Sequence, residues 1–163
     1  MAVIKTSAGD ITVELDRENA PLSVQNFEQY ARDGHFDNTI FHRVIKGFMI
    51  QGGGMTADMR SKKTRPPIKN ESANQLKNEK YTLAMARTSV PDSATSQFFI
   101  NTSDNGFLDK DQAADGVGYA VFGRVIEGKE IVDQIEAVKT RNNAGHGDVP
   151  ADPITILSVE LDD

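Results

Sequence analysis

The chain contains no cysteine and no tryptophan, and acidic side chains outnumber basic ones, 24 to 18. The lack of cysteine excludes disulfides, thiol nucleophiles and zinc–thiolate sites. The net charge of −6 disfavours a general nucleic-acid binder, because a phosphate backbone selects for cations. No run of about 18 apolar residues occurs, and the first residues do not resemble a secretory leader. We therefore expect no membrane segment and a cytoplasmic protein.

The rest of the composition is that of an ordinary globular protein, with 38% hydrophobic and 26% charged residues. We expect a single domain over residues 1–163. The histidines, His35, His42 and His146, lack the spacing of metal ligands, so we expect no metal site and no cofactor. His42 has the opposite strand parity to Arg43, which favours a structural, hydrogen-bonded role for it.

Hydrophobic periodicity predicts the order of the secondary-structure elements. Strand patterns occur at 3–15 (a hairpin), 81–86, 97–102, 119–126 and 157–161, and helical patterns run from Pro21 to Gly34 and over 128–139. With residues 39–54, the count is about eight short strands and two helices, which favours a mainly antiparallel barrel or sandwich. The terminal strands are expected to pair and close a barrel.

Three details of these elements are testable against a structure. In the first helix, Phe27 is expected to face the core and Glu28 the solvent. In the second, Lys139 and Arg141 are expected near the C-terminal end, where they complement the helix dipole. The polar segment 55–80 is either a functional loop or an ordinary solvated one.

Residues 39–54 combine closely spaced apolar side chains with Arg43 and Gln51, and end in three glycines. An unpaired cation or amide costs free energy inside a core, so a plain core strand has no need of them. The segment therefore predicts a mostly apolar cleft with a few fixed polar groups. The three glycines lack the lysine and the helix start of a phosphate loop, and indicate a bend or a close backbone approach.

Side-chain parity places apolar residues beside glutamines on two strands. Residues two apart share a face of a strand, so Met49 lies beside Gln51, and Gln97 lies beside Phe99. The residues between them suit the core. The pattern leaves two interpretations open, an apolar floor with polar arms or two amphipathic strands with glutamines at the solvent edge. Likewise, the apolar pair 107–108 either fills a core edge or lines a pocket.

Several motifs together identify a family. Residues 41–53, Phe-His-Arg-Val-Ile-Lys-Gly-Phe-Met-Ile-Gln-Gly-Gly, resemble the signature of the cyclophilins, the cyclosporin-binding class of peptidyl-prolyl cis–trans isomerases. Further matching segments, in the same order, are Pro-Ile-Lys-Asn-Glu (67–71), Leu-Ala-Met-Ala-Arg (83–87), Ser-Gln-Phe-Phe-Ile (96–100) and Val-Phe-Gly-Arg-Val (121–125). The compact chain looks like the bacterial single-domain cytoplasmic type.

The resemblance implies a closed eight-stranded antiparallel β-barrel capped by two α-helices. It also implies catalysed rotation about Xaa-Pro peptide bonds, and so assistance to protein folding. Arg43 takes the position of the catalytic arginine, and Gln51 that of a polar group able to hold a carbonyl. The substrate-binding positions are Phe48, Met49, Ala86, Arg87, Gln97, Phe99, Phe107, Leu108 and Tyr119. The implied partners are proline-containing peptides and unfolded clients, bound by a monomer.

The chain departs from the family pattern at three of these positions. Phe107 stands where many members carry tryptophan, which predicts weak cyclosporin binding with isomerase activity retained. Tyr119 stands where some carry histidine, with little expected effect. Arg87 stands where asparagine is common, and is expected to favour acidic residues near the proline. The rival hypotheses are a binding module with the same cleft but no catalysis, and an interaction protein that uses the basic run 60–65.

Overall fold

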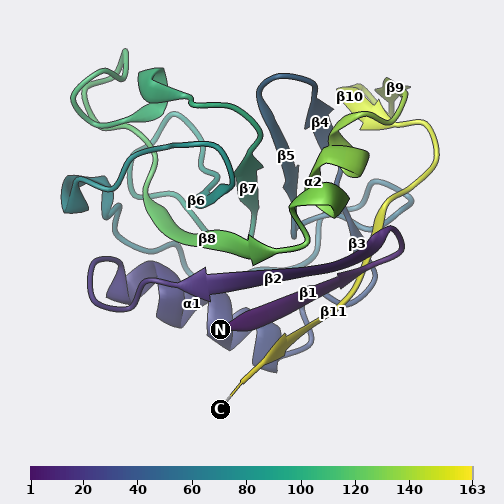
Figure 1. The fold of residues 1–163 in the computed structure, drawn as a ribbon, viewed down its shortest axis with the longest axis horizontal. Coiled ribbons are helices and arrows are strands. Elements are labelled where there is room, and N and C mark those ends of the chain that lie inside the picture. The colour runs from purple at the N-terminus through teal and green to yellow at the C-terminus, as the bar shows by residue number, and fades with distance from the viewer. Residues whose placement is uncertain (163) are drawn as a thin grey trace.

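The computed structural model of the protein describes residues 1–162, which fold into a curled antiparallel sheet with two α-helices (Figure 1). The strands are β1 (Ala2–Thr6), β2 (Gly9–Leu15), β3 (Thr39–Ile40), β4 (Arg43–Ile45), β5 (Met49–Gly52), β6 (Thr82–Met85), β7 (Phe98–Asn101), β8 (Val121–Glu127), β9 (Thr140–Asn143), β10 (His146–Pro150) and β11 (Thr155–Leu161). The helices are α1 (Pro21–Arg32) and α2 (Lys129–Glu136), with short 3-10 turns η1 (Ser72–Asn74) and η2 (Gly106–Leu108).

The hydrogen-bonded strand order is β3-β11-β1-β2-β8-β6-β7-β5-β4, and β9 and β10 form a separate hairpin. The predicted mainly β, antiparallel architecture with two helices is confirmed. The terminal strands β1 and β11 pair as expected and lie side by side (Figure 1). Within residues 1–162 the order of paired strands has two ends, at β3 and β4, so the sheet is a half-barrel.

Helix α1 begins at Pro21, as predicted, since proline needs no hydrogen-bond partner for its nitrogen at that position. The backbone N–H groups of its first turn have no acceptor within the helix, and a side chain from another part of the chain accepts their hydrogen bonds. Leu22 N and Ser23 N donate to the Glu71 carboxylate at 3.1 and 2.6 Å. The carboxylate also opposes the positive end of the helix dipole. The segment 55–80 is therefore attached to α1 rather than merely solvated.

Two predictions about the helices are wrong. Glu28, expected to face solvent, is 4% exposed, because Arg17 from the segment before α1 covers it and pairs with its carboxylate. Helix α2 ends at Glu136, so Lys139 and Arg141 lie beyond it. Arg141 belongs to β9, in a hairpin that the sequence patterns did not predict, because its strands are mostly exposed and lack apolar alternation.

The hydrophobic side chains form two clusters on opposite faces of β5 and β7. The larger one fills the curled sheet and includes Ile50, Phe98 and Ile100, all 0% exposed. The smaller one consists of Met49, Ala84, Ala86, Phe99, Leu108 and Val121. The predicted parity of these two strands is thus confirmed. Helix α1 packs against β8 and β11, and α2 packs against β2, β4 and β5.

Candidate active site

The antiparallel register aligns one residue from each of four neighbouring strands in a row. Arg43 on β4 is opposite Gln51 on β5, and Gln51 is opposite Phe99 on β7. Phe99 is in turn opposite Ala84 on β6. Directly opposed residues have Cβ atoms about 4.5–5.5 Å apart and point to the same face of the sheet. The fold therefore places Arg43 and Gln51 beside the smaller hydrophobic cluster.

A cleft of about 310 Å³ lies over this face of the sheet. Its lining residues are Arg43, Phe48, Met49, Gln51, Ala86, Arg87, Phe99, Phe107, Leu108 and Tyr119. The structure thus brings together every residue that the sequence predicted for the site except Gln97. An apolar floor with polar arms describes the arrangement better than amphipathic strands with glutamines at a solvent edge.

Gln97 does not line the cleft itself but is hydrogen-bonded to Gln51, which does. Gln51 Nε2 donates a hydrogen bond to Gln97 Oε1 at 2.9 Å, and Gln97 lines an adjoining pocket of about 150 Å³. Gly54 makes room for it, since a Cβ at that glycine would lie 2.5 Å from Gln97 Cγ. The glycine run is therefore a close approach, as predicted. The hydrogen bond holds the Gln51 amide at the edge of the cleft.

The floor of the cleft is buried and its rim is open. Met49, Phe99 and Leu108 are 2%, 5% and 8% exposed and form the floor. Phe107, 57% exposed, stands at the rim with its ring centroid 5.6 Å from that of Phe48. Of the two interpretations of the 107–108 pair, the pocket-lining one is therefore correct.

The two neighbours Arg43 and His42 have opposite environments. Arg43 is exposed at the cleft, and its side chain makes no hydrogen bond or ion pair with the described residues. His42 is buried, and this burial, with the charges of His146 and Arg43, lowers its pKa to about 4. His42 is therefore neutral near pH 7, and its Nδ1 has no hydrogen-bond partner within residues 1–162. Of these two neighbours, Arg43 is therefore the one that offers unoccupied donors to a ligand in the cleft.

The family model for cyclophilin type peptidyl-prolyl cis-trans isomerase/CLD matches residues 1–161. The chain belongs to this family. It is 55% identical over 159 residues to a peptidyl-prolyl cis-trans isomerase of Streptomyces antibioticus, covering 97% of this chain and 96% of that protein. It is 49% identical over 162 residues to peptidyl-prolyl cis-trans isomerase B of Escherichia coli, covering 99% of each. The activity of the chain is therefore peptidyl-prolyl cis–trans isomerisation.

A solved structure has the same fold. It is a cyclophilin type isomerase of Cryptosporidium parvum, in the presence of the dipeptide Ala-Pro. The TM-score is 0.80 at 30% sequence identity, over 99% of this chain and 98% of that one. The likeness covers the whole cleft-bearing sheet, so the cleft of this cyclophilin lies within a shared fold.

Arg87 plays a different part in this cyclophilin from the one its sequence suggested. Its side chain is 2% exposed, and Nε and Nη2 donate to Gly118 O at 3.1 and 2.7 Å. Nη1 donates to Thr88 O at 2.9 Å, and Nη2 forms an ion pair with Asp115 at 2.7 Å. The guanidinium also stacks 4.4 Å from the centroid of the Tyr119 ring. These contacts leave it poorly placed to select acidic residues in a peptide.

Three asparagines beneath the cleft were missed at the sequence level. Asn78, Asn101 and Asn105 are 1%, 0% and 4% exposed. The parity that joins Gln97 to Phe99 continues to Asn101, so one more step along the strand would have indicated it. No such local pattern points to the other two asparagines.

Neither helix in residues 1–162 has both the length and the apolar character needed to cross a bilayer. Over the same residues, histidine and carboxylate side chains do not gather in groups of three or more that could hold a metal ion.

Proposed function

We propose that Arg43 is the catalytic residue of this isomerase and that the apolar floor of the cleft holds the proline ring. The observation that carries the proposal is that Arg43 lines the cleft opposite Gln51 in the register, with no hydrogen-bond or ion-pair partner within residues 1–162. An arginine retained for structure alone would have its donors satisfied, as those of Arg87 are.

The chemistry of the reaction suits such a site. Amide resonance sets the barrier to rotation about the C–N bond at roughly 18–20 kcal/mol. Rotation breaks no covalent bond, so the step requires no nucleophile. In the twisted transition state the proline nitrogen loses conjugation and regains a lone pair. A guanidinium that donates to this nitrogen stabilises the twisted form more than either planar form, which lowers the barrier.

The remaining residues bind and orient the peptide in this proposal. Phe48, Met49, Phe99 and Leu108 enclose the proline ring, and the Gln51 amide holds a carbonyl on one side of the rotating bond. Ala86 and Arg87 offer backbone contacts, Gln97 supports Gln51, and Phe107 and Tyr119 form the rim. The Ala-Pro dipeptide of the Cryptosporidium parvum relative supports proline-containing peptides as ligands.

We further propose unfolded proteins as the clients, and a monomeric single domain over residues 1–163 as the working form. Cytoplasmic location stays a prediction, which fractionation of the source cells tests. Size-exclusion chromatography with light scattering tests the monomer.

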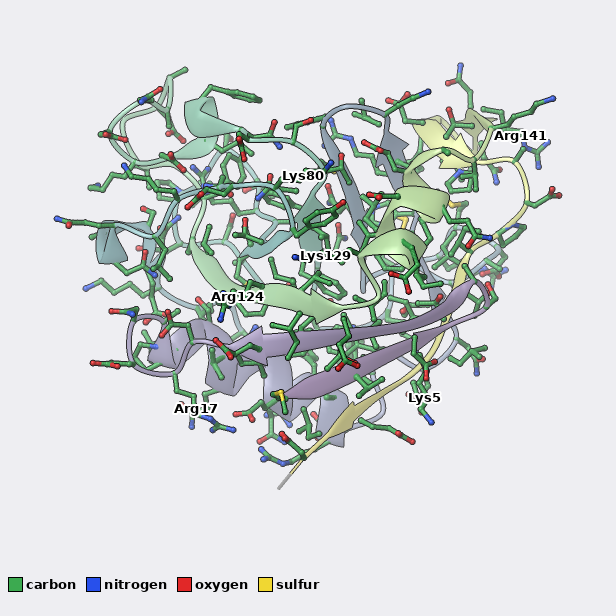
Figure 2. The ribbon with its side chains drawn as sticks, in the orientation of Figure 1. Lys5, Arg17, Lys80, Arg124, Lys129 and Arg141 are labelled. Carbon is green, nitrogen blue, oxygen red and sulfur yellow. The ribbon has the colours of Figure 1, made fainter. Side chains whose placement is uncertain are left out.

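The two rival hypotheses receive less support. A pure binding module has no need of an unpartnered cation over a proline pocket. The basic run is largely engaged within the protein, since Lys62 Nζ donates to His35 O and Asp37 O at 2.7 and 2.9 Å. Arg65 forms an ion pair with Asp33 at 2.6 Å. Six other basic side chains, labelled in Figure 2, project from several different elements around the molecule.

Exchange of the Xaa-Pro bond in a short peptide, followed by NMR, tests the role of Arg43. For Arg43→Ala we expect kcat/KM to fall by about 10²–10³, as when one transition-state donor is removed. The matched control is Arg124→Ala, because Arg124 lies on β8 (Figure 2), outside the cleft, and pairs with Glu14 at 3.2 Å. The control should keep full activity. If Arg43→Ala accelerates exchange as well as the wild type does, the proposed role of Arg43 is wrong.

A further inference from the structure

A chain of buried amide side chains runs beneath the cleft, from one wall to the other. Its members are Asn105, Asn101 and Asn78, which are 4%, 0% and 1% exposed. Burying an amide costs free energy unless its donors and acceptor are satisfied. The Nδ2 groups of all three amides donate, and the Oδ1 atoms of Asn101 and Asn78 accept, within this chain and its contacts with the walls of the cleft.

One end of the chain holds the wall formed by Phe48. Asn105 Nδ2 donates to Phe48 O at 2.8 Å and to Asn101 Oδ1 at 2.8 Å. The backbone amide of Thr102 donates to the same Phe48 carbonyl at 2.9 Å. The turn between β4 and β5, which carries the Phe48 ring, is thereby fixed to β7 and the segment that follows it.

The middle of the chain is Asn101, at the end of β7. Its Nδ2 donates to Asn78 Oδ1 at 3.1 Å and to Thr82 Oγ1 at 2.9 Å. Asn101 is opposite Met49 in the register and shares the face of Phe99. The amide is therefore joined directly to the strands that form the floor.

The other end of the chain holds the wall formed by Tyr119. Asn78 Nδ2 donates to Tyr119 O at 3.3 Å and to Asp109 Oδ1 at 3.0 Å. The backbone amide of Asn78 also donates to Asp109 Oδ1, at 2.7 Å. Tyr119 N in turn donates to Leu108 O at 2.9 Å, which links this wall to the floor.

We propose that Asn105, Asn101 and Asn78 are positioning residues that hold the Phe48 and Tyr119 walls at the separation a proline ring requires. This inference rests on the proposed function of the cleft as the proline site. The three amides touch no ligand themselves and act through the carbonyls of the two walls. Hydrogen bonds in such a chain reinforce one another in a low dielectric, so the unit holds one arrangement.

The outer hydrogen bonds of the chain end on the two walls of the cleft, at Phe48 O and Tyr119 O. Peptide binding depends on the placement of these walls, since a displacement of about 1 Å in a site weakens binding or slows the reaction.

Breaking the chain at Asn105 tests the proposal. Asn105→Ala removes both hydrogen bonds, and Asn105→Asp keeps the shape but supplies no donor near pH 7. We expect each variant to raise KM, and the dissociation constant of an Ala-Pro peptide titrated by NMR, by about tenfold. The turnover number should stay within about twofold, because Arg43 is untouched. Urea unfolding confirms that each variant is folded.

The matched control is Thr39→Val, which removes a buried hydrogen bond that involves no residue lining the cleft, from Thr39 Oγ1 to Phe36 O at 2.6 Å. It should lower stability and leave KM unchanged. If Asn105→Asp is folded and binds the peptide as tightly as the wild type does, the positioning role is refuted.

A double-mutant cycle tests whether the asparagines act as one unit. Asn105→Ala and Asn78→Ala lie at opposite ends, so their effects on peptide affinity should combine to less than the product of the single effects. Fully multiplicative effects would show two independent contacts and overturn the idea of a continuous chain. Failure of the Arg43 proposal is distinguishable, because it would appear as unchanged activity of Arg43→Ala, whereas the affinity for the peptide reports on the asparagines.

Discussion

The two faces of β5 and β7 carry hydrophobic clusters that differ in what closes them. On one face, Phe98 and Ile100 are sealed in the interior of the curled sheet at 0% exposure. On the other, Met49 and Phe99 are open to the cleft above and border buried amides below. Adjacent residues of β7, such as Phe98 and Phe99, therefore belong to different hydrophobic clusters. We expect the sealed face to supply stability, and we propose that the open face supplies recognition.

The largest effect on stability is expected at Phe98. Its ring contacts Phe27 and Phe36 with centroids 5.5 and 5.7 Å apart, in edge-to-face geometry. Phe98→Ala leaves a cavity in a fully buried cluster and should lower the free energy of unfolding by about 3–5 kcal/mol. Urea denaturation measures this loss. A loss below about 1 kcal/mol would contradict the assignment of stability to the sealed face.

The next effect is a pH dependence of stability that comes from His42. Its pKa is lowered from 6.5 to about 4 in the folded protein, chiefly by burial. Above about pH 6.5 both states hold a neutral His42, and its contribution to stability is fully present. As the pH falls toward 4, only the unfolded state takes up the proton, and about 3 kcal/mol is lost.

Comparison with His42→Gln isolates this contribution, because every carboxylate is common to both proteins. The difference in unfolding free energy between them should shrink from pH 7 to pH 4, and NMR titration should give a pKa near 4 for His42. A titration midpoint of His42 near the ordinary histidine pKa would refute the predicted pH dependence of stability. Isomerase activity, in contrast, should not follow this titration, because His42 faces away from the cleft.

Phe99 is the matched test on the open face, one residue from Phe98. Phe99→Ala should lower kcat/KM by about tenfold or more, because the proline ring loses its floor. Its cost in unfolding free energy should be smaller than that of Phe98→Ala, since the site already borders solvent. A protease-coupled isomerase assay and urea denaturation separate the two effects. Equal losses of activity in the two variants would remove the distinction between the faces.

The smallest effect on stability is expected at the rim. Phe107→Trp should change the unfolding free energy by no more than about 0.5 kcal/mol, because the side chain is 57% exposed. It should tighten cyclosporin binding, since tryptophan is common at this position in the family, and leave isomerase activity intact. Titration of the wild type and of Phe107→Trp with cyclosporin compares the two affinities. Wild-type binding as tight as that of Phe107→Trp would contradict the predicted role of the rim.

Much of the fold followed from local patterns. Parity on the strands at 49–52 and 98–101 correctly separated core-facing from cleft-facing residues, and Pro21 correctly began α1. The sequence patterns did not predict the hairpin of β9 and β10, because its strands are mostly exposed and carry no hydrophobic period. Glu28 was predicted to face solvent but is buried, because helical spacing does not reveal that Arg17, from outside the helix, covers it.

The sequence by itself determined which side chains share a face and, through its motifs, which family the chain belongs to. Both are local properties, encoded in the period of a strand and in short runs of residues. Only the tertiary structure decided that Arg43 has no hydrogen-bond or ion-pair partner within residues 1–162 while Arg87 has several, and that three separated asparagines join the walls of one cleft. These outcomes depend on contacts between distant segments, such as Asn105 with the Phe48 carbonyl, and no local period encodes such contacts.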